Sequence, residues 1–190
     1  MAEALEDAVE KKDENKTVAL IIALLALVLA FAEAGAKNAQ HHSTEVNIER
    51  SDLFSFYQAK KIRQTVVESA AQAAEASAGE AKSPALEKQI GAWKEAVAKF
   101  EKDPKSPKDS LEQILERAKA AGEDRELSNR KLEHFEYSSG ALQIAIVLAS
   151  AAIITGMSIL AWMAGGLGLI GAVLMIFGYF SPLTLPFFGG

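Results

Sequence analysis

The C-terminal part most constrains this chain, because residues 137–190 contain no charged side chain. The hydrocarbon core of a bilayer is about 30 Å thick, and roughly 20 apolar residues in a helix span it. The uncharged stretch is long enough to cross a membrane twice. Near its middle it is interrupted by Thr155-Gly156-Met157-Ser158. We therefore expect two membrane helices, over residues 139–156 and 159–180, followed by a tail over residues 181–190.

Another apolar run lies near the N-terminus, at residues 18–32. We expect a membrane helix over residues 17–36, preceded by a polar tail over residues 1–16 that is rich in acidic side chains. A cleaved signal peptide is the alternative, because the run has the right length and small residues follow it. Signal peptides begin with basic residues, so the acidic lead segment favours the membrane helix.

Small residues recur at helical spacing in all three expected spans, and such faces let membrane helices approach closely. In the first span we expect another helix to lie close to this face. For the second and third spans we expect packing within the chain, with an oligomer seam as the alternative. The small residues that we assign to these faces are Ala23, Ala26, Ala30, Ala145, Ala149, Gly165 and Gly168.

Glu33 lies near the end of the first expected span. A carboxylate inside a membrane can mark an ion pathway or a pore. The interpretation that we favour is an interfacial acid paired with Lys37, one helical turn away.

Residues 37–138 are polar, rich in helix formers and divided by prolines. Ser83-Pro84 and Ser106-Pro107 are typical of helix starts, because serine caps a helix and proline suits its first position. We expect helices over about 37–78, 84–102 and 107–138. The predicted fold is all-α, with three transmembrane helices and an elongated, antiparallel, coiled-coil-like helical stalk between the first and second.

The second stalk helix has a heptad pattern of apolar side chains, namely Leu86, Ile90, Trp93, Val97 and Phe100. This seam is too short for a stable isolated coiled coil, so it should pack on other helices. On the first stalk helix, Phe54, Phe56 and Tyr57 form a bulky patch. A slender stalk buries little core, and we expect all eight side chains to be contacts in a homo-oligomer.

The same first stalk helix carries a thin apolar stripe at Ala59, Ile62, Val66, Ala70 and Ala73. Its spacing is that of one helix face.

The sequence shows little that suggests catalysis. His41, His42, Glu45 and Glu49 are the one plausible metal-binding group, but a site would need a further ligand, and a solvated helix face is the favoured interpretation. The chain has no cysteine, and its net charge of −5 gives no reason to expect nucleic acid. We expect no enzymatic activity, no cofactor and no metal.

Two segments are distinctive: the run from Phe54 through Tyr57-Gln58-Ala59-Lys60 to Ile62, and the run from Ala141 to Ser150. Both resemble segments of a bacterial membrane-protein family known as domain of unknown function 4337. The resemblance implies the order tail, span, helical segment and two closing spans. It implies no activity and no functional residue.

These observations predict a non-enzymatic, oligomeric protein of the bacterial inner membrane with a structural or scaffold role. We expect its partners to be copies of itself and the lipid bilayer, with the N-terminus cytoplasmic and the stalk periplasmic. One alternative is a channel or transporter-like oligomer that uses Glu33. The other is an accessory subunit of a larger membrane complex.

Overall fold

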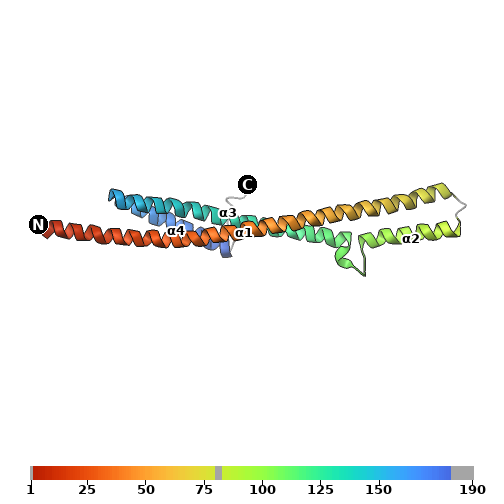
Figure 1. Ribbon diagram of the computed structural model, residues 1–190, viewed down its shortest axis with the longest axis horizontal. Coiled ribbons are helices and arrows are strands. Elements are labelled where there is room, and N and C mark those ends of the chain that lie inside the picture. Colours follow the sequence, from red (N-terminus) through yellow and green to blue (C-terminus); the bar gives the residue numbers. More distant parts are fainter. Residues whose placement is uncertain (1, 80–82, 181–190) are drawn as a thin grey trace. The chain divides into compact units, whose positions relative to one another are not determined.

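The computed structural model describes residues 2–79 and 83–180, and the side chains of residues 16–79 and 83–180. The described residues form four α-helices and a short 3₁₀ helix, without a strand (Figure 1). The elements are α1 (Ala2–Ala78), α2 (Pro84–Glu101), η1 (Pro107–Asp109), α3 (Leu111–Thr155) and α4 (Ser158–Phe180). The predicted all-α class is confirmed. The expected tail over residues 181–190 lies outside the described residues.

Three helices are long and apolar enough to cross a membrane, as the sequence predicts. They are α1, α3 and α4. In α1 and α3 the apolar segment occupies only part of a longer helix, which continues into polar sequence. The expected first and second spans are therefore segments of longer helices.

Helix ends lie where turn-forming residues predict them. Gly79 and Gly156 follow the last residues of α1 and α3 and have positive φ angles of 54° and 70°. Glycine adopts this left-handed conformation without steric cost, and it commonly ends helices. Ser83 caps α2, since its Oγ accepts a hydrogen bond from the Leu86 amide at 3.3 Å.

The start of α3 differs from the prediction. Residues Pro107–Asp109 form the 3₁₀ helix η1, and Ser106 makes no capping hydrogen bond. The cap is Ser110, whose Oγ accepts from the Gln113 amide at 3.3 Å. Because Ser110 has the extended backbone and the acceptor that a cap requires, the α-helix begins at Leu111 rather than at Pro107.

The acidic lead segment is also more regular than the expected tail, because the backbone of α1 is helical from Ala2. Alanine, glutamate and lysine are strong helix formers. Acidic residues near a helix N-terminus are also favoured by the helix dipole. The segment and the first span thus share one helix.

The chain divides into two compact units. The first, here called the span unit, comprises the described parts of residues 1–43 and 126–190. The second, here called the polar unit, is Thr44–Arg125. It holds the C-terminal half of α1, all of α2 and the first turns of α3.

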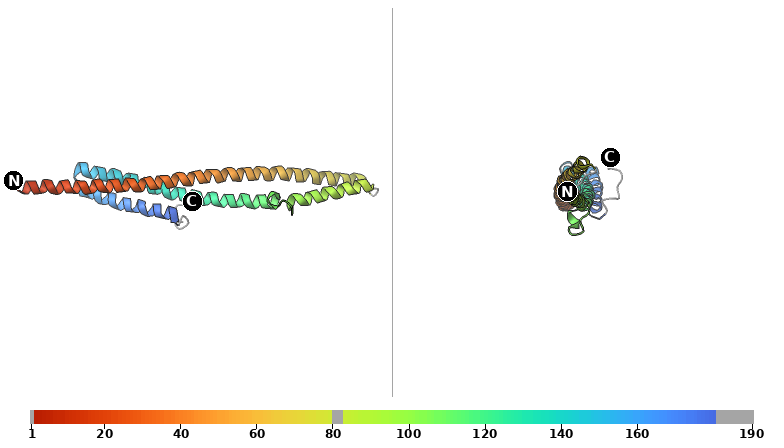
Figure 2. Two further views of the ribbon diagram at one scale, coloured as in Figure 1. Left: turned by 60° about the horizontal axis from the view of Figure 1, so that its bottom comes forward. Right: turned by 90° about the vertical axis from the view of Figure 1, so that its right-hand side faces the viewer.

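In the span unit, α1, α3 and α4 lie side by side (Figure 2). Leu25 and Ala32 of α1 and Leu142 and Ala145 of α3 form a buried cluster. Leu167 and Met175 of α4 pack against it. All three apolar helices therefore contribute to one core.

In the polar unit, α2 runs antiparallel to the end of α1 (Figure 1). Lys94 of α2 pairs with Glu75 of α1 at 2.6 Å. Nearer the start of the unit, Leu53 of α1 forms a buried cluster with Ile114 and Ala118 of α3. The end of α1 is thus covered on one side, by α3 and then by α2.

Candidate functional site

Seven of the eight predicted oligomer contacts are buried or half-buried within the polar unit. Ile90 is 5% exposed, and the other four members of the α2 heptad seam are half-buried. Phe54 and Tyr57 pack against the cluster of Leu53, Ile114 and Ala118. Phe56 differs, with 44% of its surface exposed. Of the eight side chains, only Phe56 is an exposed contact candidate.

A polar layer fixes how α2 lies on α1. Gln64 is 6% exposed, and its Nε2 donates to Glu101 Oε2 at 3.0 Å and to the Val97 carbonyl at 3.4 Å. Lys61 Nζ donates to Gln64 Oε1 at 2.7 Å. A buried amide must be hydrogen-bonded, so this arrangement favours one register of the two helices.

The charged surface of α2 adds only local support. Lys99 donates to Glu95 at 2.6 Å, one turn along the helix. This hydrogen bond and the attraction between the charges lower the pKa of Glu95 and raise the pKa of Lys99. Both side chains are exposed, so the pair supports the helix without forming a site.

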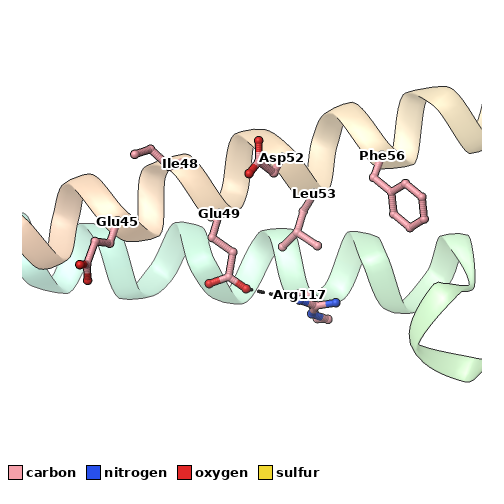
Figure 3. Close-up of a pocket in the computed structure, with 7 residues that line it drawn as sticks. All are labelled: Glu45, Ile48, Glu49, Asp52, Leu53, Phe56 and Arg117. Carbon is pink, nitrogen blue, oxygen red and sulfur yellow. Dashed lines mark hydrogen bonds and ion pairs between the residues drawn. The ribbon is translucent and has the colours of Figure 1, made fainter.

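An open groove of about 440 Å³ lies between α1 and α3 (Figure 3). Its apolar wall is Ile48, Leu53 and Phe56. The charged side chains around it are Glu45, Glu49, Asp52 and Arg117, and Arg117 Nη2 lies 3.4 Å from Glu49 Oε1.

The groove combines three carboxylates with exposed apolar side chains and a single cation. Such a surface suits a cationic, amphipathic partner. The groove is not evident in the sequence, because Arg117 comes from α3, which is far along the chain from the α1 residues that line it.

The expected apolar stripe of α1 carries exposed aliphatic side chains in the polar unit. Ile62 is 65% exposed and Val66 is 63% exposed, and Ala59 and Ala73 are exposed as well. Ala70 is half-buried and does not belong to this surface. The described chain therefore leaves these side chains without a covering helix.

The small residues of the expected spans divide into two groups. Ala145 and Ala149 are buried on α3, and Gly168 is buried on α4, where a Cβ would overlap Leu25 of α1. Ala23, Ala26 and Ala30 are exposed, as is Gly165. These four do not lie in the buried contacts among α1, α3 and α4. In α1, the larger Leu25 faces the bundle instead.

Contacts through glycine hold α3 and α4 together. Ser138 is buried, and its Oγ donates to the Gly171 carbonyl at 2.7 Å. A Cβ on Gly171 would lie 2.7 Å from Leu142 Cγ. The ring of Phe135 lies against Gly178 and Gly35, and its centroid is 4.8 Å from that of Tyr179.

Glu33 is exposed on α1. Among the described residues no ion pair joins it to Lys37, so the favoured pairing is not formed. Tyr179 OH donates to the carbonyl of the nearby Phe31 at 3.4 Å. Tyrosine is a residue type that is enriched at membrane–water interfaces.

The histidines of α1 lie on its surface. His41 and His42 are exposed, and the described part of the chain contains no group of three or more residues able to hold a metal ion. Glu45 and Glu49 line the groove instead.

A family model described as "Domain of unknown function (DUF4337)" matches residues 14–181. No curated protein matches the chain, and no solved structure does. The match spans both units and all three apolar segments.

Proposed function

The chain belongs to the DUF4337 family, and we propose that it is a self-associating membrane protein with a structural or scaffold role. In this proposal α1, α3 and α4 cross the bacterial inner membrane. The N-terminus is cytoplasmic and the polar unit is periplasmic. Copies associate through the polar unit and the small faces of the spans.

The observation that carries the proposal is the exposed apolar surface of the polar unit. A segment outside the bilayer gains no stability from lipid, so exposed Ile62, Val66 and Phe56 favour association in water. The exposed alanines on α1 offer a surface where membrane helices of two copies approach closely.

The mass of the full chain in a mild detergent tests the proposal. We expect a species of two or more copies that persists on dilution to nanomolar concentration, measured by mass photometry with the detergent contribution subtracted. Far-ultraviolet circular dichroism on the same sample reports whether the helices are intact. A helical monomer would overturn the proposal.

A second candidate is an accessory subunit of a larger membrane complex, and the acidic groove favours it. Asp52→Lys reverses one of the three negative charges at the groove. If the groove holds a cationic partner, this variant should lose a protein that co-purifies with the wild type. Equal recovery of that protein with the variant would remove the groove as its binding site.

A further inference from the structure

We infer that the outer stripe of α1 pairs with the same stripe of a second copy, with the two helices parallel and in register. The outer stripe is Ala59, Ile62, Val66, Ser69, Ala73 and Ala76. This inference rests on the proposed self-association and names its contact surface.

The end of α1 carries two heptad seams on nearly opposite faces. The inner seam, which is covered by α2 and α3, consists of Tyr57, Lys60, Gln64, Val67, Ala71, Ala74 and Ala78, and every member is at least partly buried. The outer stripe repeats with the same 3 and 4 spacing, and every member is exposed. Since successive residues turn by about 100°, Ile62 and Val66 point away from the side on which Gln64 lies.

The spacing of the outer stripe identifies the type of partner. A heptad repeat keeps one narrow face toward a neighbouring helix over several turns. The stripe holds for almost three heptads, and its members are alanine, serine or β-branched. The alanines and the serine let a second helix lie close, and Ile62 and Val66 supply apolar contact. The surface therefore suits a helix better than a small molecule or an extended peptide.

The membrane sets the direction of pairing. The same continuous helix contains the first apolar span. Copies of one chain insert with one topology, so their α1 helices point the same way and residues of equal number lie at equal depth. Parallel and in-register pairing is therefore available to a second copy without rearrangement.

The flanks of the outer stripe are compatible with a second copy. In a parallel pair the flanking contacts join Gln58 to Arg63, Thr65 to Ala70, and Gln72 to Ser77. None of these pairs places like charges next to each other. Repulsion between like charges at flanking positions excludes partner helices, and here it does not exclude a second copy. Arg63 is the one charged residue among these flanking positions. The flanks therefore carry no pattern of charges that would select a helix from a different protein.

The same geometry limits the contact. Asp52 lies one heptad before Ala59, so two Asp52 carboxylates would face each other if the pairing continued toward the membrane. The pairing should therefore begin after Asp52. This leaves the groove lined by Glu45 and Asp52 outside the contact.

Single-cysteine cross-linking of the full chain tests the inference, and the absence of native cysteine makes it direct. Cysteine replaces Ile62, Val66 or Ala73 on the stripe. As controls it replaces Glu68, which is exposed on the neighbouring face of α1, or Gln89, which is exposed on α2. After mild oxidation in membranes, we expect at least fivefold more disulfide-linked dimer at the stripe positions than at the controls.

A second variant separates this surface from self-association in general. Ile62→Glu with Val66→Glu should shift the species measured by mass photometry to smaller masses and leave helicity unchanged, because both side chains are exposed in the single chain. If the wild type is oligomeric but the stripe positions cross-link no more than the controls, the inference is overturned and the proposed function stands. A monomeric wild type would overturn both.

Discussion

At the scale of single residues, the glycines of α4 are not equivalent. Gly171 faces α3 so closely that a Cβ would lie 2.7 Å from Leu142 Cγ and 3.2 Å from the Ser138 carbonyl. Gly165 has nothing within 4 Å of the same position. The first glycine is needed for contact between helices, whereas the second is not.

We therefore predict that Gly171→Ala destabilises the span unit by about 1–3 kcal/mol, because Leu142 and a backbone carbonyl must move. Gly165→Ala is the matched control and should be neutral or slightly stabilising, since alanine is the better helix former. Thermal unfolding in detergent, followed by circular dichroism, compares the two. Equal losses for both variants would contradict the packing described for Gly171.

Glu33 is the residue on which the channel alternative depends. A scaffold role predicts that Glu33→Gln leaves the oligomer mass unchanged, because the carboxylate is exposed and forms no ion pair in the described chain. The same variant should not alter ion flux in proteoliposomes relative to the wild type. A wild-type flux that the substitution abolishes would favour the channel alternative over the scaffold.

At the scale of elements, α2 contacts α1 through a buried apolar side chain, a polar layer and the Lys94–Glu75 ion pair. Ile90 is the buried residue of α2, and Gln64 of α1 supplies the layer. The rest of the α2 seam is half-buried. A helix of this length has little stability alone, so its structure depends on this contact.

Ile90→Asp should detach α2, because an unpaired carboxylate in an apolar contact costs several kcal/mol. Hydrogen exchange of the α2 amides should then accelerate at least tenfold, while those of the span unit stay protected. Gln89→Asp is the control, since Gln89 is exposed on the same helix. Unchanged protection of α2 in Ile90→Asp would show that this packing is not what holds the helix.

Helix positions were predictable because prolines, glycines and capping serines act locally. Ser83 and Gly156 fix ends that the sequence alone indicates. Ser110 was missed as a cap because Ser106-Pro107 shows the stronger local signal, although η1 intervenes. Local chemistry therefore predicts where helices exist better than it predicts their first residue.

Which face each helix buries was less predictable. The inner seam of α1 contains lysine, glutamine and alanine, whereas the more apolar Ile62 and Val66 are exposed. Alanine stripes in α1 and in α3 look alike in sequence, yet those at Ala26 and Ala149 have opposite exposure. Which face of a helix is buried depends on where the neighbouring helices lie. The apolar pattern of one helix does not contain that information.

At the scale of the whole molecule, the proposed scaffold function depends on three helices crossing a bilayer. The apolar part of α3 gives the clearest test, because Arg130 lies just before it and Met157 just after it. If this segment crosses the bilayer, the two residues lie on opposite sides of the membrane. Both side chains are exposed, and the stretch of chain between them is roughly 40 Å long at the helical rise of about 1.5 Å per residue. That distance matches the thickness of a bilayer with its head-group regions.

Cysteine accessibility at these two positions is the most direct test. Arg130→Cys and Met157→Cys are introduced singly into the cysteine-free chain and treated with a membrane-impermeant maleimide in intact spheroplasts and in inverted vesicles. If α3 spans the membrane, the Arg130→Cys variant reacts in one preparation and the Met157→Cys variant reacts in the other. Reaction of both variants from the same side would contradict the membrane-spanning arrangement and the function proposed from it.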